Sequence, residues 1–228
     1  MTPLAWPFCV VAALYGVGHA AAQTLPENGQ TRALADSQVG QGFYLHTGPG
    51  ALVFSASAIV RETGAVLPGG TVSIAPNLTA ITELGYRWRH VAVSLTGGLP
   101  PRATVDGAGS LAPLGTLGHI RYGPVVLTAH YHIGGWGRFQ PYIGGGPVLL
   151  LIFKDTDGAV SRLDVRDHLG ICAQLGTEFT LSRHWSLFVD AKKAALKTDA
   201  TAWLGVAAIA ADIKLNPLVA SGGLSFRF

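Results

Sequence analysis

The chain has 228 residues and a formal net charge of +3, and hydrophobic residues make up 49% of it. Only 13% of the residues are Asp, Glu, Lys or Arg, about half the usual share for a soluble protein. After the first 22 residues no apolar run reaches the roughly 18 residues that a membrane-spanning helix needs, so helical spans are excluded. The scattered Lys and Arg residues also exclude a basic stripe for nucleic acid.

The first 22 residues have the pattern of a signal peptide. Residues 4–17 are apolar, and Ala20-Ala21-Ala22 offers the small residues found before a cleavage site. The segment before them carries no Lys or Arg, which departs from the usual pattern. We expect cleavage after Ala22 rather than an uncleaved anchor, because the apolar run is short. Residues 23–45, rich in Gln, Asn, Gly, Asp and Ser as far as Gly42, are expected to be a flexible mature N-terminus.

Residues 46–228 form strand-like segments joined by short turns and longer loops in alternation. Short polar turns are expected at 89–90, 134–137 and 183–184, and longer loops at 62–70, 105–118, 154–165 and 198–211. Three turns and four loops join eight antiparallel strands. Short turns on one side and longer loops on the other are typical of outer-membrane barrels. The sequence therefore predicts an all-β fold, an eight-stranded antiparallel transmembrane β-barrel preceded by a signal peptide.

Polar and apolar residues alternate along the expected strands. Before the turn at 89–90, Leu84, Tyr86 and Trp88 lie on the face opposite Glu83 and Arg87. A charge that faces lipid near the membrane midplane costs about 2–4 kcal/mol, so the charged face should line the lumen. The alternative, a soluble lipocalin-like barrel, would need far more charge outside.

Aromatic residues gather at or beside the three short turns. Such a girdle marks the level where a membrane protein leaves the lipid, and it predicts that the short turns share one membrane surface. Its expected members are Trp88, Tyr131, Trp136, Phe139, Trp185 and Phe228.

Four stretches of the chain carry a family resemblance. They are F-Q-P-Y-I-G-G-G at 139–146, A-Q-L-G through L-S-R-H-W at 173–185, L-N-P with the terminal S-F-R-F at 215–228, and G-P with A-H-Y at 123–131. Over residues 50–228 they resemble the OmpW family of eight-stranded barrels in the outer membrane of Gram-negative bacteria. The resemblance implies a narrow channel, without cofactor or metal, for passive uptake of small hydrophobic molecules and their sideways release into lipid. The terminal Phe228 is similar to the signal that the barrel-assembly machinery recognises.

The expected lumen has an apolar upper half and a charged periplasmic half. An eight-stranded barrel is barely wide enough for side chains, so an open aqueous pore is excluded. The expected solute-binding residues are Tyr122, Val126, Val148, Leu150 and Ile152. The expected residues of the constriction and of an ion-paired plug are Thr96, Lys192, Asp190, Glu83, Arg87, Glu178 and Arg227.

The resemblance implies bulky apolar side chains at a mid-depth constriction, where this sequence has Thr96 and Lys192 instead. Lys192 can pair with Asp190 or Glu178, or it can shift the preference of the channel toward amphiphiles with an anionic head.

Prolines at similar heights on three adjacent strands predict incomplete strand pairing, because proline donates no ladder hydrogen bond. They are Pro100, Pro101, Pro124 and Pro147. Two interpretations stay open at this point. The prolines form a lateral seam through which solutes leave, or the strands leave the membrane there, since a span takes about 9–11 residues.

Two other functions are compatible with an outer-membrane barrel. A structural or adhesive outer-membrane barrel would have a solidly packed lumen around Leu150. His130 and His132 share a strand face, and Ser94 and Ser186 are candidate nucleophiles. An enzyme is nevertheless not expected, because the sequence shows no set of nucleophile, base and orienting acid. Both histidines are expected at the membrane interface beside a turn. The expected partners are outer-membrane lipid and small hydrophobic solutes.

Overall fold

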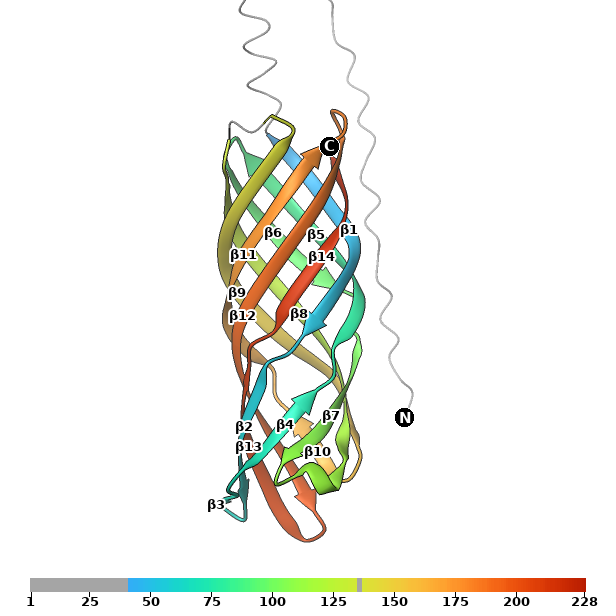
Figure 1. Cartoon of the computed structure of the whole chain (residues 1–228), viewed down its shortest axis with the longest axis vertical. Coiled ribbons are helices and arrows are strands. Elements are labelled where there is room, and N and C mark those ends of the chain that lie inside the picture. Colours follow the sequence, from blue (N-terminus) through green and yellow to red (C-terminus); the bar gives the residue numbers. More distant parts are fainter. Residues whose placement is uncertain (1–40, 135–136) are drawn as a thin grey trace, which may run out of the picture. The chain divides into compact units, whose positions relative to one another are not determined.

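The computed structural model describes residues 41–134 and 137–228 (Figure 1). The expected signal peptide over 1–22, most of the expected flexible segment over 23–45, and Trp136 of the expected girdle lie outside these residues. Within the described part of the chain, no helix is long and apolar enough to cross a membrane.

Eight strands pair antiparallel around a closed ring, as predicted. Each pairs with the next, and the last pairs with the first. They are β1 (Gly42–Val53), β5 (Asn77–Trp88), β6 (Val91–Gly98), β8 (Thr116–His132), β9 (Phe139–Asp157), β11 (His168–Thr180), β12 (Trp185–Leu204) and β14 (Leu218–Arg227). Closure gives each of these strands a partner on both sides, which matters in the membrane because an unsatisfied backbone group there costs several kcal/mol.

The wall continues beyond the ring as a second, smaller set of paired strands. They are β2 (Ala56–Glu62), β3 (Ala65–Val66), β4 (Gly70–Ile74), β7 (Arg102–Gly109), β10 (Ser161–Val165) and β13 (Ala207–Leu215), with a 3₁₀ helix at Ala112–Leu114. In Figure 1 this extension lies at the end of the barrel opposite the C-terminus.

The prediction of open loops was therefore wrong for most of the residues concerned. The ends of β8, β9 and β12 and the strands β7, β10 and β13 occupy much of the ranges assigned to loops. The physical reason is that these segments also have an apolar face: Val60, Val72, Leu117 and Ile213 are buried among one another inside the extension. Burial of this apolar surface lowers the free energy of the ordered strands relative to a solvated loop.

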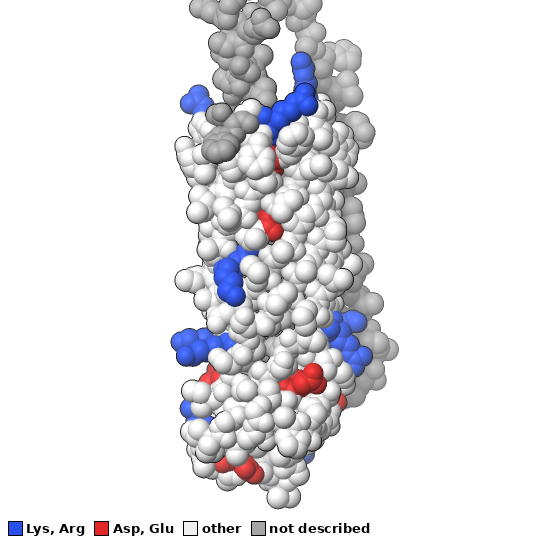
Figure 2. Space-filling view, in the orientation of Figure 1, with Lys and Arg blue, Asp and Glu red and all other residues white. Residues whose placement is uncertain are grey.

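The predicted alternation of faces is confirmed along the barrel strands. Glu83 and Arg87 are buried, whereas Leu84 and Trp88 on the same strand are exposed on the outside. Of the expected girdle, Trp88, Tyr131, Phe139, Trp185 and Phe228 are all exposed at strand ends beside the short turns. The face of the barrel drawn in Figure 2 is accordingly a tall band with few charged side chains.

Candidate functional site

The periplasmic half of the lumen holds a network of buried ion pairs. Lys192 on β12 places Nζ 2.8 Å from Glu83 Oε2 and 2.7 Å from Asp190 Oδ1. Arg227 on β14 places Nη2 2.8 Å from Glu178 Oε2. The seven residues expected at the constriction and plug all lie on the lumen face. Lys192 pairs with Asp190 and with Glu83, not with Glu178.

Arg87 differs from the expected pairing of opposite charges. Its Nη1 donates to Gln140 Oε1 (2.6 Å) and its Nε donates to the Arg89 carbonyl (2.7 Å). Thr96, also in the expected set, donates from Oγ1 to Glu83 Oε2 at 2.7 Å. Neutral partners thus supply hydrogen bonds to two of the buried charged groups, Arg87 and Glu83, which offset part of the cost of burying them.

Several members of the network were not found from the sequence. His46 lies between the two glutamates, with Nδ1 3.5 Å from Glu83 Oε1 and Nε2 3.3 Å from Glu178 Oε1. Tyr142 OH donates to Asp190 Oδ2 (2.9 Å), and so does Gln174 Nε2 (2.7 Å). Their position on the same strand faces as the charged residues is the signal in the sequence that indicates them.

Tyr44 was missed for a different reason, because β1 already begins at Gly42, inside the range expected to be flexible. Its hydroxyl donates to Glu83 Oε1 (3.3 Å) and lies 2.9 Å from His130 Nε2. Together these groups fill the periplasmic end of the lumen with buried polar side chains, most of them hydrogen-bonded or ion-paired. The ion pairs of this end of the lumen are therefore buried away from the outer surface.

The expectation that His130 and His132 lie at the membrane interface was wrong. Both are buried inside the barrel, where their rings pack on each other (5.0 Å between centroids) and on Tyr142. Ser94 Oγ lies 2.9 Å from Thr128 Oγ1 in the same layer. In the part of the chain that the structure describes, no group of three or more His, Cys, Asp or Glu residues is placed to hold a metal ion.

Above the plug the lumen is apolar. Tyr122, Val126, Val148 and Leu150 are buried there and Ile152 is partly buried, so the five expected solute-binding residues all face inward. The stem of Lys192 forms part of the floor. Around Val148 and Leu150 the side chains leave a cavity of about 20 Å³, room for little more than one water molecule.

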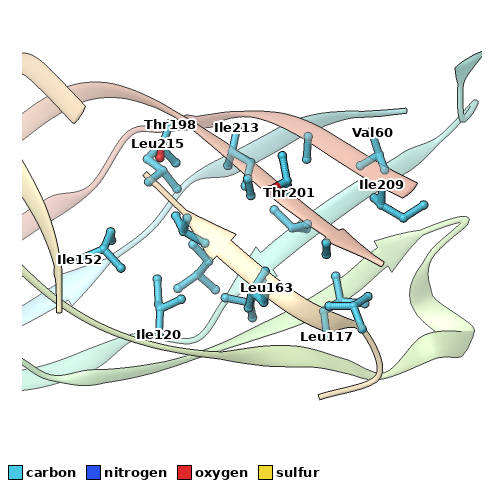
Figure 3. Close-up of a pocket in the computed structure, with 18 of the residues that line it drawn as sticks. Val60, Leu117, Ile120, Ile152, Leu163, Thr198, Thr201, Ile209, Ile213 and Leu215 are labelled. Atoms are coloured by element: carbon cyan, nitrogen blue, oxygen red, sulfur yellow. The ribbon is translucent and has the colours of Figure 1, made fainter. Parts of the chain in front are cut away.

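A larger cavity of about 80 Å³, called the upper cavity because it lies farther from the periplasmic end, is found inside the extension (Figure 3). Leu150 lines both cavities, and Ile152 lines the upper one. In Figure 3 the upper cavity is surrounded by aliphatic side chains from several strands, and Thr198 and Thr201 are the polar residues labelled. Leu150 therefore separates two apolar spaces along the barrel axis.

The strand ladder is interrupted beside the lower cavity. The pairing of β6 with β8 ends at Thr96 and Val126, and the pairing of β7 with β8 starts only at Arg102 and Arg121. Between them Tyr122 N donates to the Pro101 carbonyl at 3.3 Å. The expected effect of Pro100, Pro101 and Pro124 on pairing is thus seen at this gap.

Pro147 lies one strand away. The ladder of β8 with β9 passes from Val126–Val148 directly to Ala129–Gly145, whereas Pro147 stays within the continuous ladder of β9 with β11.

A third cavity of about 30 Å³ lies at the gap between β6 and β7. Val126 and Lys192 line its inner side. Gly97, Pro101 and Leu99, whose side chain is 69% exposed on the outside, line it toward the wall. The lumen therefore approaches the outer surface where β8 passes from its ladder with β6 to its ladder with β7.

Comparison with known proteins gives consistent matches. The model of the OmpW family matches residues 86–228. Outer membrane protein AlkL of Ectopseudomonas oleovorans is 34% identical over 166 residues, which is 72% of each chain. Dibenzothiophene metabolism operon protein DoxH of Pseudomonas sp. strain C18 is 32% identical over 181 residues, 78% of this chain and 84% of that protein.

Solved structures agree with the fold. The solid-state NMR structure of AlkL in DMPC bilayers has a TM-score of 0.65 at 28% identity and covers 91% of this chain and 97% of that one. The crystal structure of OprG from Pseudomonas aeruginosa has a TM-score of 0.77 at 22% identity, over 83% of this chain and 97% of that one.

Proposed function

This chain belongs to the OmpW family of the Gram-negative outer membrane, and from that premise we propose that it is a passive channel for small hydrophobic molecules. One observation carries the proposal: the lumen is apolar from the extension down to Lys192 and is closed below by buried ion pairs. Such a lumen can take up an apolar solute from outside, whereas the buried ion pairs block its passage along the barrel axis to the periplasm.

Entry is driven by burial of apolar surface. A solute in the upper cavity loses contact with water and gains about 25 cal/mol for each Å² of apolar surface that it buries. To move on, it must displace Leu150, because that side chain lines the upper and the lower cavity. The cavities are small, so we infer that the solute opens its path by moving aliphatic side chains, which cost no hydrogen bonds.

Release is proposed to be lateral. The plug opposes further descent, because separating Lys192 from its two carboxylates in a buried site costs several kcal/mol. At the gap between Thr96 and Arg102 a solute meets few backbone hydrogen bonds and the exposed Leu99. An apolar solute that passes there enters the lipid directly and is never returned to water.

The residues favour apolar solutes over anionic amphiphiles. The ammonium group of Lys192, the cation nearest to the lower cavity, is already engaged by Glu83 and Asp190. The relative DoxH is named for dibenzothiophene metabolism, and dibenzothiophene is an apolar fused aromatic. A planar solute of that kind is a suitable first substrate to test.

The test is uptake of dibenzothiophene and of a fatty acid by cells that lack the protein or carry it. Leu150→Lys, which places a charge between the two cavities, is expected to abolish the protein-dependent part of uptake. Leu150→Met, which conserves volume, should keep it. Thr156→Lys adds the same charge at an exposed position of β9 and should also keep it. Heat-modifiable migration on gels verifies that each barrel is assembled.

The alternative is a structural or adhesive barrel without transport. The small volume around Val148 favours it to some degree. Uptake that does not depend on the protein for either solute would support this alternative and end the channel proposal.

We also propose that the C-terminus is the element that the barrel-assembly machinery recognises. Phe228 is 67% exposed, its ring packs edge-on against Phe226, and its N donates to the Phe43 carbonyl at 3.0 Å. Removing the exposed ring by Phe228→Ala should slow assembly in cells far more than it lowers the stability of the folded barrel. Equal assembly rates for both proteins would overturn this assignment.

A further inference from the structure

Three cationic side chains lie side by side on the outer surface of the wall. Arg102 on β7 is the register partner of Arg121 on β8, and Arg121 is the register partner of Lys154 on β9. All three side chains are exposed. Directly opposed residues on neighbouring strands have Cβ atoms about 5 Å apart, so these three residues, the basic row, form one patch of positive charge.

A bulge in β9 is what brings Lys154 into the row. Tyr122 pairs with Ile152 and Arg121 pairs with Lys154, so Phe153 is an extra residue between two register positions. Inward residues of β9 below the bulge have even numbers, as Val148 and Leu150 do. Without the bulge Lys154 would point into the apolar lumen. The irregularity instead turns it outward beside Arg121, which is a common use of β-bulges.

The charges of the basic row are not neutralised by ion pairs among the described residues. In the described ranges 41–134 and 137–228, none of its members forms an ion pair with a carboxylate. Asp155, next to Lys154 in sequence, pairs in register with the buried Ile120 and accepts a hydrogen bond from Val165 N. Like charges placed directly opposite each other on a sheet are destabilising, so the row favours binding of an external anion.

The height of the row corresponds to the outer lipid surface. Arg121 lies ten residues above Tyr131 of the aromatic girdle on the same strand. At about 3.3 Å per residue and a tilt of about 40°, that separation spans about 25 Å along the barrel axis, the height of the apolar band of an outer-membrane barrel. On the periplasmic side of the row the outer surface is apolar, with Phe153, Leu127 and Leu99 exposed. Figure 2 shows Lys and Arg side chains at the lower edge of the uncharged band, toward the extension.

We propose that the basic row binds the phosphate groups of a phosphorylated lipid in the outer leaflet. Two guanidinium groups and one ammonium group supply several charge-assisted donors, and guanidinium matches phosphate oxygens in pairs. The acyl chains of the same molecule then lie on Phe153, Leu127 and Leu99. A soluble anion would use only the charged part of this surface, whereas a lipid uses both parts. The bound lipid also sits immediately above the gap in the ladder between Thr96 and Arg102.

The experiment is native mass spectrometry of the full protein in a neutral detergent, titrated with lipid A. The test variant is Arg102→Gln with Arg121→Gln and Lys154→Gln. The matched control is Arg89→Gln with Arg138→Gln and Arg183→Gln, which removes the same charge from exposed positions at the periplasmic end. Dephosphorylated lipid A and millimolar inorganic phosphate are the two chemical controls.

We expect the unsubstituted protein and the matched control to bind one lipid A at least about tenfold more tightly than the test variant. Dephosphorylated lipid A should bind the unsubstituted protein as weakly as lipid A binds the test variant, and inorganic phosphate should not displace the lipid. An equal loss of affinity for lipid A in the test and control variants would overturn the proposal. Equal affinity of the unsubstituted protein for lipid A and for dephosphorylated lipid A would overturn it too. Displacement by inorganic phosphate would show an anion site and would also overturn the assignment to a lipid.

Discussion

Lys192 and Glu83 form an ion pair across the lumen, with 2.8 Å between Lys192 Nζ and Glu83 Oε2, although their strands β12 and β5 are not neighbours in the barrel. Both side chains are almost completely buried. The pair therefore connects opposite walls of the barrel and forms the boundary between the apolar lumen above and the plug below.

Replacing Lys192 by Met is expected to destabilise the barrel by about 3–5 kcal/mol, because Glu83 and Asp190 would stay buried without their cation. Urea unfolding in lipid bilayers measures the loss. Lys193→Met is the control: Lys193 lies on the outer face and its Nζ donates to the Asn216 carbonyl. Its removal should cost at most about 1 kcal/mol. Similar losses in both variants would show that the buried network does not contribute specifically.

Gly176→Ala is expected to destabilise the barrel by about 1–3 kcal/mol. Gly176 is the register partner of Tyr142, and a Cβ at this position would lie 2.4 Å from the tyrosine ring. The ring must then move, which disturbs its hydrogen bond to Asp190. Gly97→Ala is the matched control, since a Cβ at Gly97 meets no atom within 4 Å. Unfolding free energies that fall equally in both variants would contradict the argument.

Gly97→Phe tests lateral release. Gly97 forms part of the wall of the cavity at the ladder gap. Because Ser94 and Thr96 on the same strand face inward, a side chain at Gly97 points outward, where a Cβ meets no atom within 4 Å. A phenyl ring there should cover the outer side of the gap and reduce protein-dependent uptake several-fold without loss of assembled barrel. Gly97→Ala leaves most of that space free and should keep uptake. Full uptake by an assembled Gly97→Phe barrel would rule out this exit, while leaving the channel proposal intact.

Acid is expected to loosen the turn that connects β9 to β10. The backbone N–H groups of Leu163 and Arg162 donate to Asp157 and lower the pKa of its carboxyl below 3.8. A lowered folded-state pKa means that the stabilisation is present above pH 3.8 and is lost as the pH falls through the folded-state pKa.

Hydrogen exchange at the Leu163 amide measures this effect. The protection factor should fall between about pH 5 and pH 2 in the unsubstituted protein. In Asp157→Asn the protection factor should already be lower at the high end of this pH range, and it should be nearly independent of pH. The reason is that the amide oxygen still accepts a hydrogen bond but carries no charge. A protection factor that does not change with pH in the unsubstituted protein would contradict the prediction.

The sequence by itself determined the wall of this protein. Alternation around Glu83 and Arg87 predicted which face lines the lumen, and the spacing of the turns predicted eight strands. Both predictions rest on local physics, because a strand alternates its faces at every residue and lipid does not tolerate exposed charge. The apolar run containing Val148 and Leu150 was placed in the lumen for the same reason.

Only the tertiary structure decided which groups meet. That Lys192 reaches Glu83 across the lumen, and that His46 lies between two glutamates, depends on the stagger of all eight strands at closure. The sequence also did not predict the strands of the extension or the bulge at Phe153, because both depend on the register with neighbouring strands. A pattern along one strand specifies its faces, whereas contacts across the barrel are set by how the whole sheet closes.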